Sequence, residues 1–208
     1  SSITKTTAGY NSVLSSRAQV GKDCYLEVSY VHRNATIGDN VVLSYIDIHD
    51  ETVPSDVVLH GLKQKDGKFV ARIYGVKDNP KEGKLFGKTL EDIIAENGID
   101  ASELGAGYNG TLWTADMYPA CDTIREAVAA ALNIYDMVHG KGDVSAWRNT
   151  TRKSLCSGFN DADPDAIIAW DNRMQELVRM DGIAKLILLG KPAKEAKDIL
   201  RTNKLTPI

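Results

Sequence analysis

Apolar residues recur at a short and nearly regular spacing in the first third of the chain. Between Ala8 and Leu62, a small or aliphatic residue recurs every five or six positions. Several of these are followed by a small residue or a turn former, and a small or β-branched residue often comes four places later. The recurring positions, called the frame positions below, are Ala8, Leu14, Val20, Leu26, Val31, Ile37, Leu43, Ile48, Val53 and Leu59.

Such a period predicts a solenoid of very short strands, because each turn can bury its apolar face only against the next turn. We interpret the pattern as a left-handed parallel β-helix built from hexapeptide repeats, with about three hexads per turn and about three turns. The five-residue steps predict distorted corners. Gly38, Asn40 and Asn34 are candidates for the positive-φ residue that a tight corner requires.

A different pattern follows the solenoid. Asp66-Gly67 separates the strand-like run around Leu59–Leu62 from the run Phe69–Val76. An Asp-Gly pair between two such runs is a strong hairpin signal. We therefore predict a β-hairpin that covers the end of the solenoid and so protects an exposed edge.

The second half has helical periodicity. Thr89 precedes a short apolar helix, Asp122 or Thr123 begins a longer one, and Asp163-Pro164 begins another. This last helix either continues through Asp181-Gly182 or kinks there, and a final helix is expected over 193–200.

The predicted fold class is therefore α+β. A left-handed β-helix with a capping hairpin is expected over residues 1–85, and a helical linker domain over 86–208.

Composition narrows the function classes. The chain is 43% hydrophobic and 25% charged, as an ordinary globular protein is, and its net charge of −3 argues against nucleic acid or an anionic membrane as the main partner. No apolar run approaches the roughly 18 residues of a membrane span, and no signal-peptide pattern is present. Cys24, Cys121 and Cys156 fit no metal-binding spacing, which predicts reduced thiols and a cytoplasmic location. The chain begins Ser-Ser and enters the repeat almost at once, which suggests a piece of a longer polypeptide.

Several separate stretches resemble one enzyme family in its own order. The chain from about residue 20 onward is similar to the central region of fucose-1-phosphate guanylyltransferases and of bifunctional fucokinase/GDP-fucose pyrophosphorylases. The stretches that carry the resemblance are Leu59–Leu62, Asp66–Val70, Ile73–Val76, Asp78–Lys81, Leu112–Cys121, Lys153–Asn160 and Asp163-Pro164.

The resemblance implies a parent enzyme with a guanylyltransferase domain before the β-helix and, in bifunctional members, a sugar kinase after it. Such a parent would use GTP, and ATP if it carries the kinase, with Mg²⁺. This sequence has no Gly-rich nucleotidyltransferase loop with its downstream basic residue, and Gly140-Lys141-Gly142 is too short for a kinase phosphate loop. The chain is therefore expected to be a non-catalytic scaffold without a cofactor, whose partners are the neighbouring catalytic domains and, in a second possibility, further copies of itself.

The loop at Asp78, Asn79 and Lys81 is the first candidate for contact with substrate. Its cation and amide groups suit a sugar phosphate that arrives from a neighbouring domain. The same residues also suit a plain turn with a solvated lysine.

Two further groups of candidate residues suit either contact with a ligand or a purely structural role. Trp113, Asp116 and Tyr118 suit a sugar-facing or interdomain surface, or else the core. Arg152, in a basic cluster with Arg148, suits a nucleotide phosphate or else a salt-bridged helix end.

His32, His49 and His60 lie among the predicted coils. Hexapeptide acyltransferases use a histidine on a coil as general base, but a histidine without an identified partner is a weak indication of one. An acyltransferase is therefore the second hypothesis, and an oligomerisation module is the third. No carboxylate pair or metal-ligand set stands out from the spacing.

Overall fold

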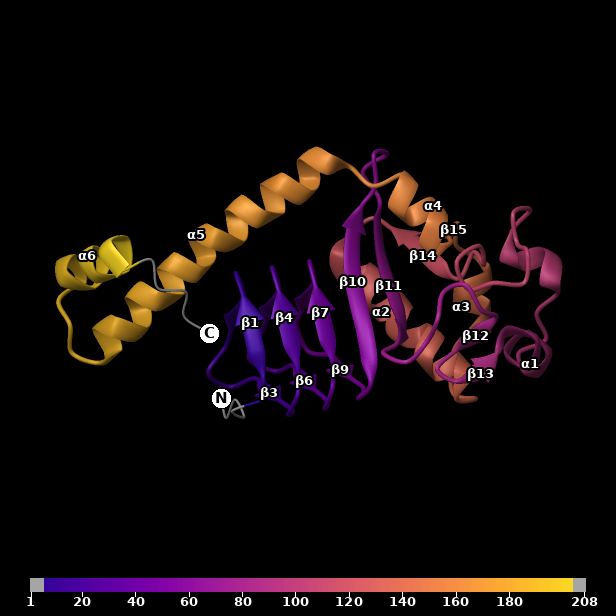
Figure 1. Ribbon diagram of the computed structural model, residues 1–208, viewed down its shortest axis with the longest axis horizontal. Coiled ribbons are helices and arrows are strands. Elements are labelled where there is room, and N and C mark those ends of the chain that lie inside the picture. Colours follow the sequence, from indigo (N-terminus) through magenta and orange to yellow (C-terminus); the bar gives the residue numbers. More distant parts are fainter. Residues whose placement is uncertain (1–5, 204–208) are drawn as a thin grey trace.

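Three ladders of very short parallel strands form the solenoid (Figure 1). The computed structural model describes residues 6–203, so the ends of the two predicted units, 1–5 and 204–208, lie outside the described residues. The first ladder contains β1 (Ala8–Tyr10), β4 (Tyr25–Glu27) and β7 (Val42–Ser44). The second contains β2 (Val13–Leu14), β5 (Tyr30–Val31) and β8 (Asp47–Ile48), and the third β3 (Gln19–Val20), β6 (Thr36–Ile37) and β9 (Thr52–Val53).

The turns stack in a nearly constant register. Contacts between neighbouring turns join residues 17 positions apart, as between Ser12 and Ser29, and 16 apart in the last turn, as between Asn40 and Asp56. The frame positions after Ala8 are all buried, at most 7% exposed, and point into the space between the ladders. Ala8 itself is exposed. The predicted solenoid of about three turns is therefore confirmed, and its interior is the aliphatic set identified from the sequence.

The corners are built by two columns of residues with positive φ. One column contains Asn11, Val28 and Tyr45, and the other contains Asp23, Asn40 and Asp56. Asn40 was predicted correctly.

The predictions for Gly38 and Asn34 were wrong. Gly38 is needed for close approach, because a Cβ there would lie 2.5 Å from Oγ of Ser55 on the next turn. Asn34 instead bonds across turns, since its amide donates to Oδ1 of Asp50 over 3.0 Å.

The predicted hairpin is confirmed. β10 (Val57–Lys63) pairs in parallel with β7 and antiparallel with β11 (Phe69–Gly75), and Gly67 takes the positive φ of the turn. β14 (Tyr118–Cys121) then pairs with β11, and β15 (Arg152–Lys153) pairs with β14. One sheet therefore runs from the first solenoid turn into the second half of the chain, in the order β1-β4-β7-β10-β11-β14-β15.

Helices and two small strands complete the second half. They are β12 (Lys84–Leu85), β13 (Lys88–Thr89), α1 (Leu90–Glu96), a 3₁₀ turn (Ala101–Leu104), α2 (Ile124–Val138), α3 (Val144–Arg148), α4 (Leu155–Asn160), α5 (Pro164–Leu188) and α6 (Ala193–Asn203). The predicted caps are present, because Thr89, Thr123 and Asp163 each accept a hydrogen bond from a backbone N–H of the first turn. α5 continues through Gly182. The strands in this region were not predicted, because each is short and one contains Pro119.

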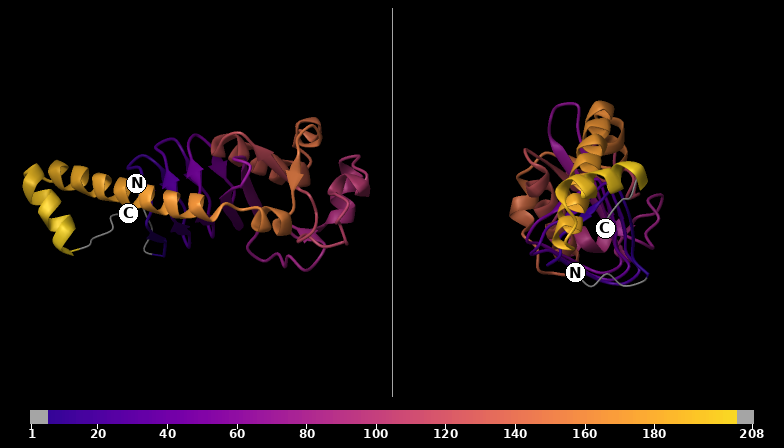
Figure 2. Two further views of the ribbon diagram at one scale, coloured as in Figure 1. Left: turned by 90° about the horizontal axis from the view of Figure 1, so that it is seen from above. Right: turned by 90° about the vertical axis from the view of Figure 1, so that its left-hand side faces the viewer.

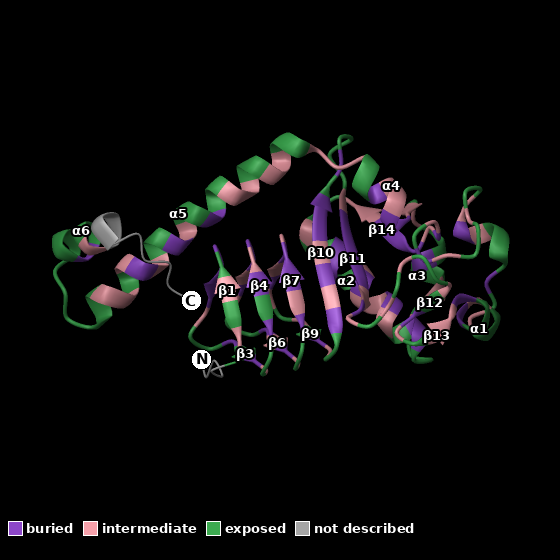
Figure 3. Ribbon diagram, viewed as in Figure 1, coloured by how far each residue is buried: buried purple, intermediate pink, exposed green. Residues whose placement is uncertain are grey.

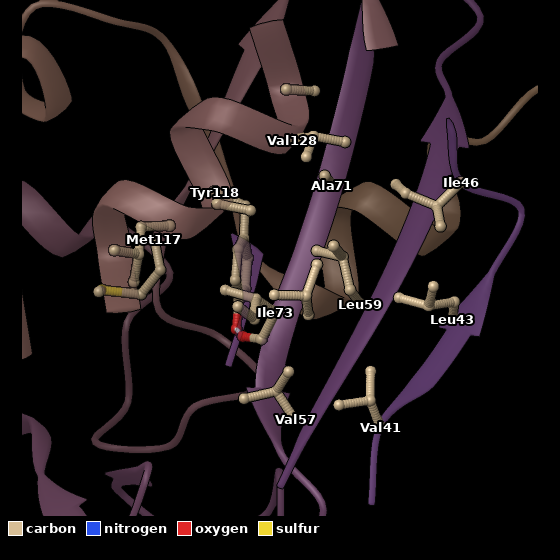
Figure 4. Packing of buried hydrophobic residues seen from close by; sticks show 14 of the residues in the cluster. Val41, Leu43, Ile46, Val57, Leu59, Ala71, Ile73, Met117, Tyr118 and Val128 are labelled. Atoms are coloured by element: carbon tan, nitrogen blue, oxygen red, sulfur yellow. Dashed lines mark hydrogen bonds between the residues drawn. The ribbon is translucent and has the colours of Figure 1, made fainter. Parts of the chain in front are cut away.

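A continuous core joins the solenoid to the helical half (Figures 3 and 4). Leu43 and Leu59 of the solenoid face Ile73 of β11, and Tyr118 of β14 and Val128 of α2 lie in the same cluster. Tyr118 also donates its hydroxyl proton to the carbonyl oxygen of Ile73 over 2.7 Å. Buried residues gather in the strands and in the helices against them, whereas α5 is mostly exposed or half-buried. The division into two units at residue 85 stays a prediction.

α5 turns back along the whole solenoid (Figures 1 and 2). It packs there through a second, smaller cluster that contains Val13, Val28, Met174 and Val178. Two polar contacts fix this seam: Trp170 Nε1 donates to the carbonyl oxygen of Val28 over 3.0 Å, and the Asn11 amide donates to Asp171. Within residues 6–203, none of the helices is both long enough and apolar enough to cross a membrane.

The last solenoid turn, which packs between β4 and β10, should be the part of the solenoid most sensitive to truncation. We expect Leu43→Ala, at a side chain with 0% exposure, to lower the free energy of unfolding by about 2–5 kcal/mol, because it leaves a cavity between two turns. Leu188→Ala, at a side chain 86% exposed, is the matched control and should change it by less than about 0.5 kcal/mol. Urea denaturation measures both, and equal effects would contradict the assignment of the core.

Candidate functional site

A cleft of about 510 Å³ opens at the base of the hairpin, where the solenoid meets the helical half. The last solenoid corner contributes Asp56, the loop after β11 contributes Lys77 to Asn79, and Phe86 closes one side. Tyr135 and His139, at the end of α2, form the opposite wall. Three segments that are far apart in the sequence therefore meet here.

The cleft has an aromatic wall. The rings of Phe86 and Tyr135 meet edge to face with centroids 4.9 Å apart, and Tyr135 stacks on His139 at 4.2 Å. His139 Nδ1 donates to the carbonyl oxygen of Tyr135 over 2.7 Å, so Nε2 is the acceptor of the neutral ring. The polar part of the lining contains Lys77 and Lys84 and the carboxylates of Asp56, Asp78 and Glu82. An aromatic face beside such polar groups suits a small polar ligand such as a sugar.

Asp78 lies in this cleft, as one of the predicted candidates, but its carboxylate holds the loop together. Oδ2 accepts from the backbone N–H groups of Gly75 at 2.6 Å and Phe86 at 2.8 Å, and Oδ1 accepts from Gly87 at 3.3 Å. A carboxylate with both oxygens on backbone donors is not arranged to bind Mg²⁺ or to act as a base.

Asn79 also lines the cleft and is likewise engaged locally. Its side-chain oxygen accepts from the N–H of Lys81 over 3.1 Å, and its amide donates to Glu82 over 3.3 Å. The Lys81 side chain is exposed, and the lysines that line the cleft are Lys77 and Lys84. Lys81 was predicted from its place in a motif, whereas Lys77 and Lys84 were not predicted, because only the fold brings them to the cleft.

Trp113 is 39% exposed and lies next to the same loop, because its backbone N–H donates to the carbonyl oxygen of Pro80 over 2.8 Å. Asp116 lies elsewhere, against the 3₁₀ turn, where its N–H donates to the carbonyl oxygen of Leu104 over 2.8 Å. Burial raises the pKa of the Asp116 carboxyl, and the cation of Arg152 opposes this. The structure thus joins Trp113 to the loop of Asp78 and keeps Asp116 and Arg152 together in a second place.

Arg152 ties several backbone segments together. Its guanidinium lies over the Trp147 ring at 3.8 Å and donates to carbonyl oxygens of Asp116, Glu103 and Trp147 at 3.0, 2.7 and 3.0 Å. These donors are therefore occupied within the fold.

His60 is on the outer face of the hairpin, beside Arg72. Its Nδ1 accepts from Nη2 of Arg72 over 2.6 Å, and the buried Arg72 also donates to the carbonyl oxygen of Leu155 over 3.1 Å. Burial, together with the neighbouring cation, lowers the pKa of His60 to about 4. The ring is therefore neutral at pH 7 and has a packing role.

His32 and His49 share a carboxylate partner, Asp47, that was not predicted from the sequence. Nε2 of His32 lies against Oδ1 of Asp47, and Nε2 of His49 lies 3.1 Å from Oδ2 of the same residue. The frame positions contain the relation between the two histidines. Val31 and Ile48 are three frame positions apart, which is one turn of the solenoid, and a histidine follows each of them. Stacking of these turns places the two rings together.

Comparison with known proteins identifies the family. The family model described as the fucose pyrophosphorylase domain matches residues 2–123, which is more than half of the chain. The chain belongs to this family. The matched part of the fucose pyrophosphorylase domain contains the whole solenoid, the hairpin and the loop of Asp78, whereas Tyr135, His139 and Arg152 follow it.

Two curated relatives carry the same name. Fucose-1-phosphate guanylyltransferase of Mus musculus is 29% identical over 169 residues, which are 72% of this chain and 26% of the relative. Fucose-1-phosphate guanylyltransferase of Homo sapiens is 26% identical over 162 residues, 68% of this chain and 26% of the relative. The chain thus spans about a quarter of the length of these relatives. No solved structure gives a significant match.

The half-buried His60 should make stability depend on pH. Its pKa is about 4 in the folded chain and 6.5 in the unfolded chain, so between these values only the unfolded chain binds the proton. The free energy of unfolding should therefore fall as the pH falls through this window, by about 1.4 kcal/mol per pH unit from this residue. Urea denaturation of the wild type and of His60→Gln from pH 7.5 to 4 measures it. The wild-type curve should be the steeper one; parallel curves would contradict the prediction, and His139→Gln serves as the control.

Arg152 should tolerate no other cation. We expect Arg152→Lys to lower the free energy of unfolding by about 2–3 kcal/mol, because an ammonium cannot span the same carbonyls or stack on Trp147. Arg179→Lys is the matched control, since Arg179 only pairs with Glu176 on the exposed face of α5, and it should cost less than about 0.5 kcal/mol. Equal costs in urea denaturation would show that Arg152 is free for another role.

Proposed function

We propose that this chain is the non-catalytic scaffold of an enzyme that makes GDP-L-fucose from fucose 1-phosphate and GTP. The observation that carries the proposal is the family match over residues 2–123, because it covers the solenoid and the hairpin together. The relatives that share this region are named for guanylyl transfer onto fucose 1-phosphate. In a bifunctional parent, a kinase would also phosphorylate L-fucose with ATP.

The scaffold role rests on how the chain uses its polar groups. Asp78 and Arg152, two of the candidates for substrate contact, form their hydrogen bonds with backbone groups of the chain itself. We therefore assign the nucleotides and Mg²⁺ to neighbouring catalytic domains, which are the proposed partners. The cleft with Lys77, Lys84 and its aromatic wall is the surface of this chain that we propose to face the sugar phosphate.

The proposal includes the handedness and the setting of the solenoid. We infer a left-handed β-helix of hexapeptide repeats, supported by the buried aliphatic frame positions and the 17-residue stacking. A cytoplasmic enzyme is supported by three cysteines that form no disulfide among the described residues. Self-association through the solenoid is a further part of the proposal, and light scattering that gives a monomer at high concentration would contradict it.

Enzyme assay tests the central claim. The purified chain, given fucose 1-phosphate, GTP and Mg²⁺, should form no GDP-fucose above the background without protein, because guanylyl transfer is assigned outside it. Chromatography of the nucleotides measures the product. Formation that is proportional to the amount of the chain would overturn the scaffold proposal.

An acyltransferase is the second candidate, and one observation favours it. His32 and His49 now have a carboxylate partner, Asp47, which is the kind of group that orients a general base. Saturable binding of acetyl-CoA in calorimetry would support this activity. A flat titration would remove it and leave the first proposal standing.

A further inference from the structure

Three side chains converge on the outer face of two neighbouring solenoid turns. Tyr30 of β5 pairs in register with Asp47 of β8, and Val31 pairs with Ile48. Val31 and Ile48 point into the core, both with 0% exposure, so the alternation of a strand sends His32, Asp47 and His49 outward. They come from two turns, and the fold alone brings them together.

The donor atoms lie close enough for one ion. One nitrogen from each ring and one oxygen of Asp47 all lie within 4.8 Å of one another. Nε2 of His49 is 3.1 Å from Oδ2 of Asp47, and Nε2 of His32 is hydrogen-bonded to Oδ1. Donors at the usual Zn–N and Zn–O lengths of a tetrahedral ion are about 3.3 Å apart, so this set needs adjustments that bring its donor atoms closer together by at most about 1.5 Å.

The surroundings allow those adjustments and access by solvent. The side chains of His32, Asp47 and His49 are 28%, 25% and 30% exposed, and a cavity of about 290 Å³ adjoins the two rings. The rings are stacked with centroids 3.9 Å apart and an angle of 12° between their planes, so each must tilt for both nitrogens to reach one ion. Tyr30 stacks on the other side of His32 and fixes the column at that end.

We propose that His32, Asp47 and His49 bind a divalent transition-metal ion, with Zn²⁺ as the first choice and water as the fourth ligand. Two imidazoles and one carboxylate favour Zn²⁺, Co²⁺ or Ni²⁺ over Mg²⁺ or Ca²⁺, which prefer all-oxygen sites. The ion links the second and third turns of the solenoid through side chains. This site is separate from the cleft at the base of the hairpin, and it does not depend on guanylyl transfer.

Calorimetric titration with Zn²⁺ tests the site on the whole chain. The wild type should bind one Zn²⁺, and His32→Gln, Asp47→Asn and His49→Gln should each weaken binding by about 100-fold or more. Loss of a residue that only hydrogen-bonds to a metal ligand already lowers metal affinity by about 10- to 100-fold. His139→Gln is the matched control for removal of an imidazole and should bind as the wild type does. Mg²⁺ should give no saturable heat.

Two independent measurements keep the test decisive if one variant fails to fold. Co²⁺ bound to the wild type should give the intense visible absorption of a tetrahedral site. Zn²⁺ at a hundred times its Kd should raise the Tm by about 5–10 °C, because only the folded chain holds the three ligands together. No saturable Zn²⁺ binding by the wild type, or binding that survives in all three variants, would overturn the proposal and leave a His–Asp–His hydrogen-bonded cluster only.

Discussion

Stacking of the solenoid turns at a spacing of 17 and then 16 residues is the constraint on which the structure depends. Because side chains alternate along a strand, a shift of one residue would turn every buried frame position outward. The same register aligns the corner columns, in which residues with positive φ repeat once per turn. It also aligns the outward residues, and so it creates the cluster around Asp47. Core, corners and surface sites are therefore consequences of one spacing.

The hairpin continues the sheet of the solenoid into the rest of the chain. β10 is parallel to the solenoid on one side and antiparallel to β11 on the other, so it changes the direction of the sheet without interrupting it. β14 and α2 then pack on β11, and Tyr118 is anchored to the carbonyl oxygen of Ile73. The cleft at this junction is lined by a solenoid corner, by the loop after β11 and by the end of α2, and the carboxylate of Asp78 holds that loop in place. Such support suits a surface that positions a ligand or a neighbouring domain.

Sequence patterns predicted the solenoid, the hairpin and the main helices, because each depends on local spacing. The buried frame positions, the Asp66-Gly67 turn and the caps Thr89, Thr123 and Asp163 are of this kind. The strands β14 and β15 were missed because they exist only through pairing with β11 and with each other. Lys77, Lys84 and the wall of Tyr135 and His139 were missed for the same reason, since no local pattern shows which residues meet across a cleft. The cluster of His32, Asp47 and His49 was predictable only in part. The frame positions show that the two histidines are one turn apart, but they do not show that the three side chains point the same way.

The seam beneath α5 has a consequence for how the molecule comes apart. This helix runs the length of the solenoid, yet its contact cluster of Val13, Val28, Met174 and Val178 is separate from the main core and much smaller. Regions with few buried apolar contacts open at a lower free energy than the whole domain. We expect α5 to detach as a unit while the turns stay stacked, so its backbone amides should exchange with deuterium well before those of β7 and β10. The partly open state would expose Val13 and Val28, which α5 covers in the native structure, and the half-buried Trp170 more fully, to a protease or a chaperone.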